Sequence, residues 1–429
     1  GLAYALENYG TLSWSKVIDP ALRLAQQGFK VSHDFSHVLD RYKKRLTEDS
    51  ATAKAYYKKD GNSYLPGEII KLPDLASTLK ELKEEGPKAF YEGDIADKIV
   101  AAMEKDKGLI THNDLKSYSV SLRRPVEGSY RGYKIVSMPP SSSGGIHLIQ
   151  MLNILEAHNL EEMGFGSSES IHLLAEVMKR AFADRSKYLG DSDFVYVPQE
   201  GLISKSYAQE LNRKIKSFRA TPSKEIEGGN PFRYESPDTT HFSVMDKEGN
   251  AVSNTYTLNS SFGSGIVIPG TGILMNNEMD DFSSKPGVPN QFGLIGAEAN
   301  AIEPHKRPLS SMTPTMVFKG GEPYLILGSP GGPTIITAVL QVIINVIDHK
   351  MNVAEAVVSP RLHHQWTPDI LYSEKGFSAD TKKILEKKGQ NLNQTRAMGS
   401  VQAILFDDGY FYGAADPRRP DSGAIAVSP

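Results

Sequence analysis

A threonine in the middle of the chain has a setting that would make it a nucleophile. Thr239 follows Asp238, where a polar stretch at 214–238 gives way to a run of alternating apolar residues. A threonine hydroxyl is a weak nucleophile at neutral pH unless a base lies beside it. If the Asp238–Thr239 bond were cut, the new α-amine of Thr239 would be that base, since free α-amines have a pKa of about 7.7 to 8.0. The structural alternative is that Thr239 simply begins a β-strand.

Two pairs of polar residues downstream have spacings suited to binding a substrate. Thr257 and Asn259 are two apart on an expected strand, so both side chains would project from one face. Glu278 and Asp281 place two carboxylates three residues apart, where they could hold an ammonium group. Each pair also has a plain structural explanation. The first would be the solvated face of an edge strand, and the second an ordinary loop.

A serine pair lies in a segment that prolines stiffen. Ser310 and Ser311 stand between Pro308 and Pro314, so their hydroxyls are suited to donating hydrogen bonds to a carboxylate. A simple turn would also explain this segment.

A glycine-rich loop precedes the most apolar helical segment of the chain. Gly331 and Gly332 come before Pro333, which suits the first position of a helix expected at 335–347. Glycine lets backbone N–H groups approach a ligand closely, and a helix N-terminus adds partial positive charge. The loop therefore predicts an oxyanion hole, with a structural turn as the alternative.

The composition excludes several classes of protein. The chain of 429 residues is 39% hydrophobic and 23% charged, as expected for a globular protein with one large or two medium domains. A net charge of -3 argues against a nucleic-acid partner. The longest apolar run, at 335–347, is too short and too polar to cross a bilayer. The absence of cysteine excludes disulfides and thiolate chemistry, and we expect no metal and no cofactor.

The expected elements are helices in the first half and a mixture afterwards. Apolar residues spaced for one helix face predict helices over 20–25, 75–85, 95–103, 168–188, 335–347 and 380–388. Segment 214–238 is expected to be a loop. Alternating runs at 239–245 and 251–258 predict a hairpin around a turn at 246–250, and short strands are expected at 403–406 and 410–412. This mixture predicts an α+β fold.

Motifs along the whole chain closely resemble those of the γ-glutamyltransferases, the glutathione hydrolases. From the threonine onward the resemblance rests on segments 239–242, 276–287, 306–314, 328–332 and 361–366. Upstream it continues in segments 130–133, 138–145 and 181–185.

The resemblance implies an N-terminal-nucleophile hydrolase whose fold is a four-layer αββα sandwich and whose precursor cuts itself. Residues 1–238 would be the large-subunit part and 239–429 the small subunit, together forming one αββα domain. The chain opens on Gly1 without an initiator methionine or signal pattern, so we expect the N-terminal portion of the large subunit to be missing. The family's arginine for the substrate α-carboxylate lies in that portion, so the chain as given would be a fragment of an active enzyme.

Site roles are implied residue by residue. Thr239 would be the nucleophile, and autoprocessing would cut between Asp238 and Thr239. The Gly331 and Gly332 N–H groups would hold the oxyanion. Segment 285–300 resembles the family's lid loop, with Phe292 where a tyrosine is more usual, so a hydroxyl latch is not expected. The γ-glutamyl group would be bound by Thr257, Asn259, Glu278, Asp281, Ser310 and Ser311.

The implied activity is transfer of the γ-glutamyl group of glutathione or another γ-glutamyl compound to water, an amino acid or a dipeptide. The family's bacterial members imply a periplasmic or secreted protein. Three other functions remain open: a cephalosporin acylase, a poly-γ-glutamate depolymerase, or an inactive remnant that only binds. Two carboxylates, Glu278 and Asp281, favour a substrate with a free α-amine.

Overall fold

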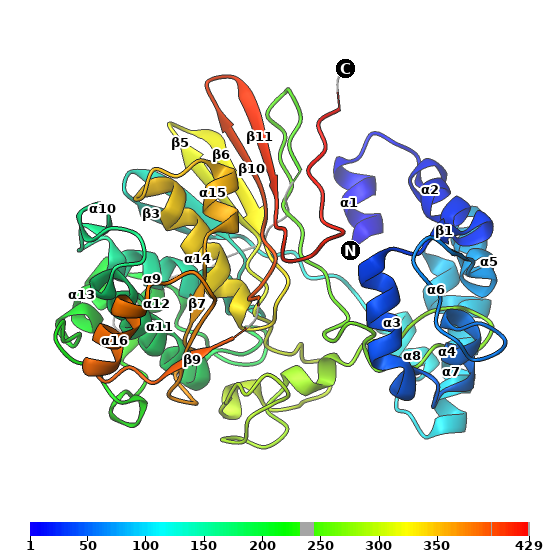
Figure 1. The fold of residues 1–429 in the computed structure, drawn as a ribbon. Helices are drawn as coiled ribbons and strands as arrows, with labels where there is room; N and C mark the ends of the chain where they lie inside the picture. The colour runs from blue at the N-terminus through cyan, green and yellow to red at the C-terminus, as the bar shows by residue number, and fades with distance from the viewer. Residues whose placement is uncertain (232–243, 396, 428–429) are drawn as a thin grey trace. The chain divides into compact units, whose positions relative to one another are not determined.

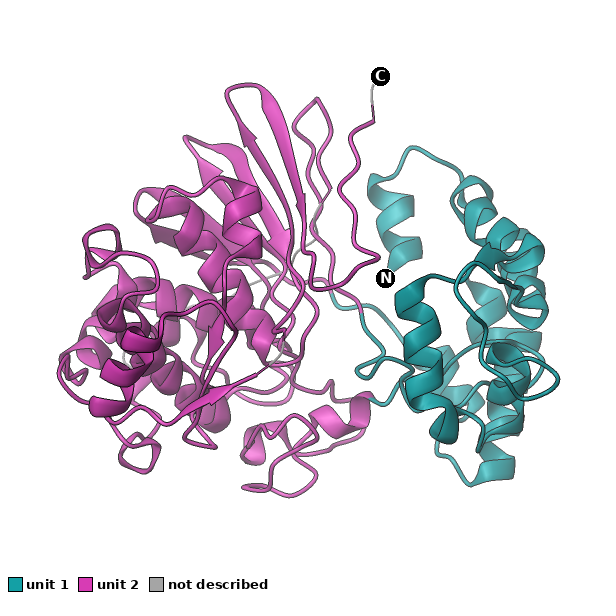
Figure 2. Cartoon of the chain, viewed as in Figure 1, with its two compact units in different colours: residues 1–121, 257–277 teal, residues 122–256, 278–429 magenta. Residues whose placement is uncertain are grey.

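The computed structural model describes residues 1–231, 244–395 and 397–427 (Figure 1). The chain forms two compact units (Figure 2). Unit 1 comprises residues 1–121 and 257–277, and unit 2 comprises 122–256 and 278–429. Within the described ranges, no helix has both the length and the apolar character needed to cross a membrane.

Unit 1 is mainly helical, and several of its helices begin at residues that cap them. The Ser32 side chain accepts the Phe35 N–H, and Thr111 and Asp114 form a capping box. One short antiparallel pair, β1 (Phe29–Lys30) with β2 (Ile69–Ile70), joins the helices. The helices are α1 (Leu2–Tyr9), α2 (Trp14–Gln27), α3 (His33–Leu46), α4 (Ser50–Tyr56), α5 (Pro73–Glu85), α6 (Lys88–Glu92), α7 (Asp94–Asp106) and α8 (His112–Ser117).

Unit 2 is built on a six-stranded antiparallel sheet with the order β11-β10-β6-β5-β4-β3. Its strands are β3 (Val126–Tyr130), β4 (Tyr133–Ser137), β5 (Thr315–Lys319), β6 (Glu322–Gly328), β10 (Gln402–Asp407) and β11 (Tyr410–Ala415). A smaller sheet contains β7 (Leu362–His363), β8 (Leu371–Ser373) and β9 (Leu392–Gln394). Ser137 pairs with Thr315, so the segments after β4 and before β5 lie side by side.

Helices α9, α14 and α15 pack on the large sheet, and α11 packs on α9 behind them (Figure 1). Every residue of α9 is buried, as expected for a helix between a sheet and a second helical layer. The helices of unit 2 are α9 (Gly144–Leu155), α10 (Leu160–Met163), α11 (Ser168–Tyr188), α12 (Gln199–Ile203), α13 (Lys205–Arg213), α14 (Thr334–Ile347), α15 (Val353–Val358) and α16 (Ala379–Lys387). Among the described residues of unit 2 there are also the 3₁₀ turns η1 (Ser223–Glu225), η3 (Glu278–Asp281) and η4 (Glu298–Asn300).

The α+β class is confirmed, and all six predicted helices form, in α2, α5, α7, α11, α14 and α16, the last of which ends at Lys387, one residue before the predicted end. The strands predicted at 403–406 and 410–412 lie in β10 and β11. The described part of the predicted loop, 214–231, contains only η1 and one further 3₁₀ residue, Pro231.

The predicted hairpin is confirmed only around its turn. Asp246 Oδ1 accepts the N–H groups of Glu248 and Asn250, and Met245 bridges Ala251. The prediction of a strand through 251–258 is wrong, because residues 252–258 are not in a strand. Residues 239–243 of the predicted first strand lie outside the described residues.

Local side-chain hydrogen bonding explains why the chain is not a strand at 257–259. Thr257 Oγ1 accepts the Asn259 N–H at 2.8 Å, and Asn259 has a φ of 72°. A threonine hydroxyl competes for backbone N–H groups, and asparagine tolerates the left-handed region. Thr257 and Asn259 therefore lie in a turn and not on one face of a strand.

Candidate active site

A buried asparagine joins the acidic turn η3 to the serine segment in unit 2. Asn300 Nδ2 donates to the Asp281 carbonyl at 2.8 Å, and Asn300 Oδ1 accepts the Leu309 N–H at 3.0 Å. Both hydrogen bonds use the same side chain, so the turn that carries Glu278 and Asp281 lies next to the chain entering Ser310. No pattern in the sequence pointed to Asn300.

The serine segment is held by the loop between β4 and α9. The N–H and Oγ of Ser143 both lie 2.9 Å from the Ser310 carbonyl, and the Ser310 N–H donates to the Ser141 carbonyl at 2.9 Å. A Cβ at Gly144 would lie 2.2 Å from the Met312 carbonyl oxygen, so only glycine allows this approach. Motif 138–145 therefore acts as a cradle for Ser310.

A buried arginine that had no predicted role joins the serines. Arg185, in the last turn of α11, donates from Nε to Ser143 Oγ at 2.9 Å and from Nη2 to Ser311 Oγ at 3.2 Å. Burial lowers its pKa to about 10, and the nearby Asp281 opposes that shift, so Arg185 stays charged at neutral pH. Because Ser311 Oγ accepts from Arg185, the hydroxyl proton of Ser311 is directed to another acceptor. Only motif 181–185 pointed to this residue from sequence.

The two carboxylates on η3 affect each other. Burial, and then the charge of Asp281, raise the pKa of Glu278 to about 7. An ammonium group beside them would favour the ionised form of both carboxylates. The group of Glu278, Asp281, Arg185 and Ser311 therefore combines negative and positive charge, as a zwitterionic ligand requires.

The glycine loop has backbone conformations that favour glycine. Gly331 has a φ of 139° and Gly332 a φ of 57°, and α14 begins directly after Pro333. The Gly331 carbonyl accepts from the Thr334 N–H and hydroxyl at 3.2 and 2.8 Å. Neither glycine N–H donates a hydrogen bond to another described residue. Both donors at the positive end of α14 are thus available for an anion.

Phe292, from the expected lid loop, lies against this glycine loop. A Cβ at Gly332 would stand 3.1 Å from two carbons of the Phe292 ring. The Phe292 carbonyl accepts from Gln365 Nε2 at 3.1 Å, and the preceding Gln291 N–H donates to Asp280 Oδ2 at 2.9 Å. Segment 280–292 therefore connects the acidic turn to the glycine loop.

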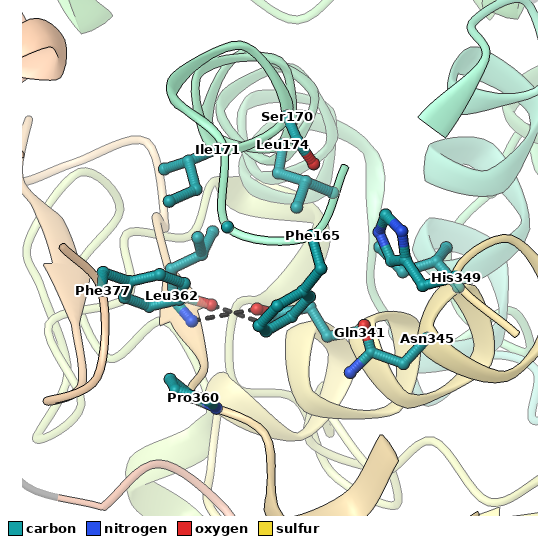
Figure 3. Close-up of a pocket in the computed structure, with 12 residues that line it drawn as sticks. Phe165, Ser170, Ile171, Leu174, Gln341, Asn345, His349, Pro360, Leu362 and Phe377 are labelled. Carbon is teal, nitrogen blue, oxygen red and sulfur yellow. Dashed lines mark hydrogen bonds between the residues drawn. The ribbon is translucent and has the colours of Figure 1, made fainter. Parts of the chain in front are cut away.

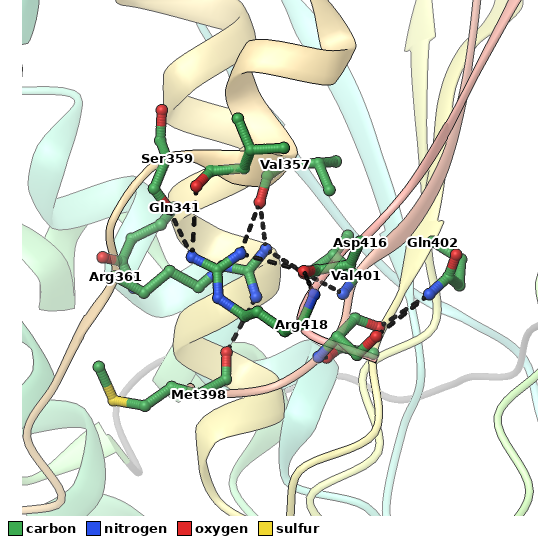
Figure 4. A network of polar contacts seen from close by, with 12 residues as sticks. Gln341, Val357, Ser359, Arg361, Met398, Val401, Gln402, Asp416 and Arg418 are labelled. Atoms are coloured by element: carbon green, nitrogen blue, oxygen red, sulfur yellow. Dashed lines mark hydrogen bonds and ion pairs between the residues drawn. The ribbon is translucent and has the colours of Figure 1, made fainter. Parts of the chain in front are cut away.

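A buried ion-pair network near the C-terminus supports the other side of the glycine loop (Figure 4). Arg361 donates to Asp416 at 2.7 Å and to the Met398 carbonyl at 2.9 Å, and Asp416 accepts the Val401 N–H. These bonds hold the segment around Gly399, whose Cα is 3.1 Å from a Cβ placed on Gly331.

The predicted site residues do not all fall in one unit. Unit 2 contains Glu278, Asp281, Ser310, Ser311, Gly331 and Gly332. Thr257 and Asn259 belong to unit 1, where Asn259 Nδ2 donates to the Asn277 carbonyl at 3.2 Å. Asp238 and Thr239 lie outside the described residues. The described ranges hold no cluster of three or more potential metal ligands among His, Asp and Glu.

A separate cavity between α11 and α14 is too small for a substrate (Figure 3). Its volume of about 10 Å³ admits at most one water molecule. Gln341 and Leu362 in its wall exchange two hydrogen bonds, at 2.8 and 2.9 Å. None of the candidate site residues lines it.

The chain is similar to several known proteins along most of its length. The "Glutathione hydrolase proenzyme" of Escherichia coli (strain K12) is 51% identical over 422 residues, which cover 98% of this chain and 73% of that protein. The protein of the same name from Pseudomonas sp. (strain A14) is 44% identical over 430 residues, covering 98% and 75%. The crystal structure of cephalosporin acylase from Bacillus halodurans has a TM-score of 0.87 at 28% identity, covering all of this chain and 77% of that one.

A family model takes in nearly the entire sequence. The model described as gamma-glutamyltranspeptidase matches residues 1–426. With this match and a relative that is 51% identical over 422 residues, the chain belongs to the gamma-glutamyltranspeptidase family.

Proposed function

We propose that this protein is a self-processing γ-glutamyl transferase and hydrolase that acts on glutathione and related γ-glutamyl compounds. The observation that carries the proposal is the group of opposite charges in unit 2. Glu278 and Asp281 suit the α-ammonium of a γ-glutamyl group, and the Ser310 and Ser311 hydroxyls suit its α-carboxylate. The relatives named glutathione hydrolase proenzyme support the same substrate.

Thr239 takes part in both steps of the proposed acyl transfer, because its hydroxyl first forms an ester with the γ-glutamyl group and is then released from that ester. The Thr239 α-amine accepts the hydroxyl proton as Oγ1 attacks the γ-carbonyl carbon of the substrate. The Gly331 and Gly332 N–H groups stabilise the oxyanion, the C–N bond breaks, and the leaving amine receives the proton. Water, an amino acid or a dipeptide then attacks the γ-glutamyl ester and releases the Thr239 hydroxyl. Thr257 and Asn259 are assigned to binding the γ-glutamyl group, and no step needs a cofactor.

Self-cleavage would use the same hydroxyl. Thr239 Oγ1 attacks the carbonyl carbon of Asp238, the peptide becomes an ester, and water hydrolyses the ester. This step divides the chain into a large-subunit part, 1–238, and a small subunit, 239–429. The finer fold in this proposal is the four-layer αββα sandwich, and the proposed location is periplasmic or secreted.

Two experiments test the function. Mass spectrometry of the full-length protein should find a new N-terminus at Thr239, and the cleaved protein should release p-nitroaniline from γ-glutamyl-p-nitroanilide faster when a dipeptide acceptor is added. A protein that stays uncut and inactive would be the binding remnant. Cleaved protein that hydrolyses a cephalosporin amide or poly-γ-glutamate but not the γ-glutamyl anilide would favour the acylase or the depolymerase. The 28% identity to the cephalosporin acylase structure, against 51% to a glutathione hydrolase, favours the γ-glutamyl substrate.

Removal of one carboxylate should weaken substrate binding and leave self-cleavage intact. Glu278→Gln is expected to raise KM for γ-glutamyl-p-nitroanilide by about ten- to a hundredfold, because a hydrogen bond to a charged group contributes about 1.5 to 3 kcal/mol. Cleavage of the precursor involves no ammonium, so its rate should stay near that of the parent. Glu161→Gln, which changes an exposed carboxylate on α10, is the matched control. An unaltered KM for Glu278→Gln would remove Glu278 from the binding site.

The raised pKa of Glu278 should also appear in the pH profile. As the pH falls through about 7, Glu278 takes up a proton and loses the charge that holds the substrate ammonium. The ratio of kcat/KM between the parent and Glu278→Gln should therefore be large at pH 8 and approach one well below pH 7. The Thr239 α-amine titrates in both proteins and cancels in this ratio. A ratio that stays constant with pH would contradict the assignment.

A further inference from the structure

Helix α11 holds the chain that precedes the proposed cleavage bond. Segment 214–231 has almost no regular structure, yet α11 side chains bind its backbone at several points. Arg180 donates to the Lys214 carbonyl at 2.8 Å, and Lys179 donates to the Thr221 carbonyl at 2.9 Å. Further along the helix, Lys187 donates to the Gly228 carbonyl at 3.2 Å.

A further attachment uses both backbone polar groups of Gly229, its N–H and its carbonyl. The Gly229 N–H donates to Asp184 Oδ1 at 2.8 Å, and the Tyr188 hydroxyl donates to the Gly229 carbonyl. Asp184 and Tyr188 are four residues apart on α11, so they face the same side of the helix. The N–H and the carbonyl of Gly229 are therefore both hydrogen-bonded to the same face of α11.

The positions of Gly229 and Gly201 have no room for a side chain. A Cβ on Gly229 would lie 2.2 Å from the Tyr207 hydroxyl oxygen, and a Cβ on Gly201 would lie 1.9 Å from the Pro231 carbonyl oxygen. The chain thus passes between α11, α12 and α13 along a path that has no room for a side chain at either glycine. We call Gly228–Pro231 and its partners Asp184, Tyr188 and Tyr207 the linker anchor.

Asp184 has no role in the proposed acyl transfer, yet the fold keeps it fully buried. It pairs with no cation in the part of the chain that the structure describes, and burial raises its pKa to about 6. Three donors compensate: the Gly229 N–H and the Tyr207 hydroxyl, both at 2.8 Å, and Gln150 Nε2 at 2.5 Å. A buried carboxylate needs such hydrogen-bond donors, and Asp184 loses one of its three if Gly229 leaves this position.

We propose that Asp184, Tyr188 and Tyr207 are positioning residues for self-cleavage, because they hold the chain at Gly229, nine residues before the proposed Asp238–Thr239 cleavage bond. The inference rests on the proposed self-cleavage. Pro231 is seven residues before Asp238, and a fully extended chain spans at most about 3.3 to 3.6 Å per residue, so the linker anchor sets an upper limit on the distance between Pro231 and the bond.

The linker anchor could act by orienting the cleavage bond or only by shortening the chain that leads to it, and these two roles predict different degrees of slowing of self-cleavage when the anchor is lost. Without the bonds from Asp184 and Tyr188, the next attachment upstream is Lys187 Nζ, which donates to the Gly228 carbonyl at 3.2 Å, ten residues before Asp238. For any chain segment, lengthening from seven to ten residues changes the closure probability by less than about twofold, since the loop-closure free energy depends logarithmically on length. Loss of a fixed orientation costs far more, so a tenfold or larger slowing would indicate positioning.

The test compares variants of the full-length precursor. Asp184→Asn and Gly229→Ala are expected to slow self-cleavage at least tenfold, followed on denaturing gels. Once cleaved, both should have kcat and KM for γ-glutamyl-p-nitroanilide within threefold of the parent, because the linker then ends at a free carboxylate. Asp348→Asn is the matched control. Asp348 is also buried and accepts a tyrosine hydroxyl, that of Tyr130 at 2.8 Å, but does not contact the linker.

The outcomes separate this inference from the proposed function. Cleavage of both variants within threefold of the parent rate would overturn the positioning role, as would equal slowing in Asp348→Asn at a similar melting temperature. A parent precursor that stays uncut would instead contradict the proposed self-cleavage. If Asp184→Asn does not fold, Tyr188→Phe removes only the hydroxyl that holds the Gly229 carbonyl, and it should still slow cleavage beyond the twofold that tethering allows.

Discussion

Thr239→Ala is expected to leave the precursor in one piece and without measurable turnover. One hydroxyl makes both attacks, so its removal should block maturation and lower kcat by about 10⁴-fold or more, as for other enzymes that lose their nucleophile. Thr239→Ser keeps a hydroxyl and an α-amine and should retain part of both activities. Denaturing gels, intact mass and release of p-nitroaniline measure the two functions separately.

Thr240→Ala is the matched control, because it removes a neighbouring hydroxyl from the same sequence. It should still be cleaved between Asp238 and Thr239. Two fragments from Thr239→Ala would show that another group cuts the chain.

A side chain at Gly332 is expected to lower kcat with little change in KM. Gly332→Val places a β-branched residue at a φ of 57°, and its Cβ would lie 3.1 Å from the Phe292 ring, so the N–H groups of the loop must shift. Loss of one oxyanion donor costs about 2.7 to 4 kcal/mol, which is about 10²- to 10³-fold in kcat. Pro333 has no N–H and cannot replace the donor. The oxyanion exists only after Thr239 has attacked, so the ground state is little affected.

Gly320→Val separates this effect from backbone strain. Gly320 has a φ of 62° in the turn between β5 and β6, and a Cβ there would meet no atom within 4 Å. The control should lose some thermal stability and keep its kcat. If kcat of cleaved Gly332→Val stays within twofold of the parent, the oxyanion is held elsewhere. If Gly320→Val loses as much kcat as Gly332→Val, strain is the cause.

Short-range chemistry explains which parts of the fold were predictable. The helix at 168–188 was visible because its apolar residues repeat at helical spacing, and the loop before α14 because two glycines and a proline end one element and begin another. The sheet formed by β3 to β6 was not predicted. Its strands are short, and its central pair joins Ser137 to Thr315 across the middle of the chain. No local pattern encodes such a partner.

For the candidate site, the sequence by itself determined the chemical groups: a threonine after a polar linker, a pair of carboxylates, a serine pair and a glycine loop at a helix start. The tertiary structure alone decided what surrounds them. Arg185 contacts Ser311 from a helix more than a hundred residues earlier, and Asn300 joins the acidic turn to the serine segment. It also decided that Thr257 and Asn259 lie in a turn. The physical reason is range: residue type and spacing define what a short segment can do, whereas burial and long-range hydrogen bonds arise only when distant segments pack together.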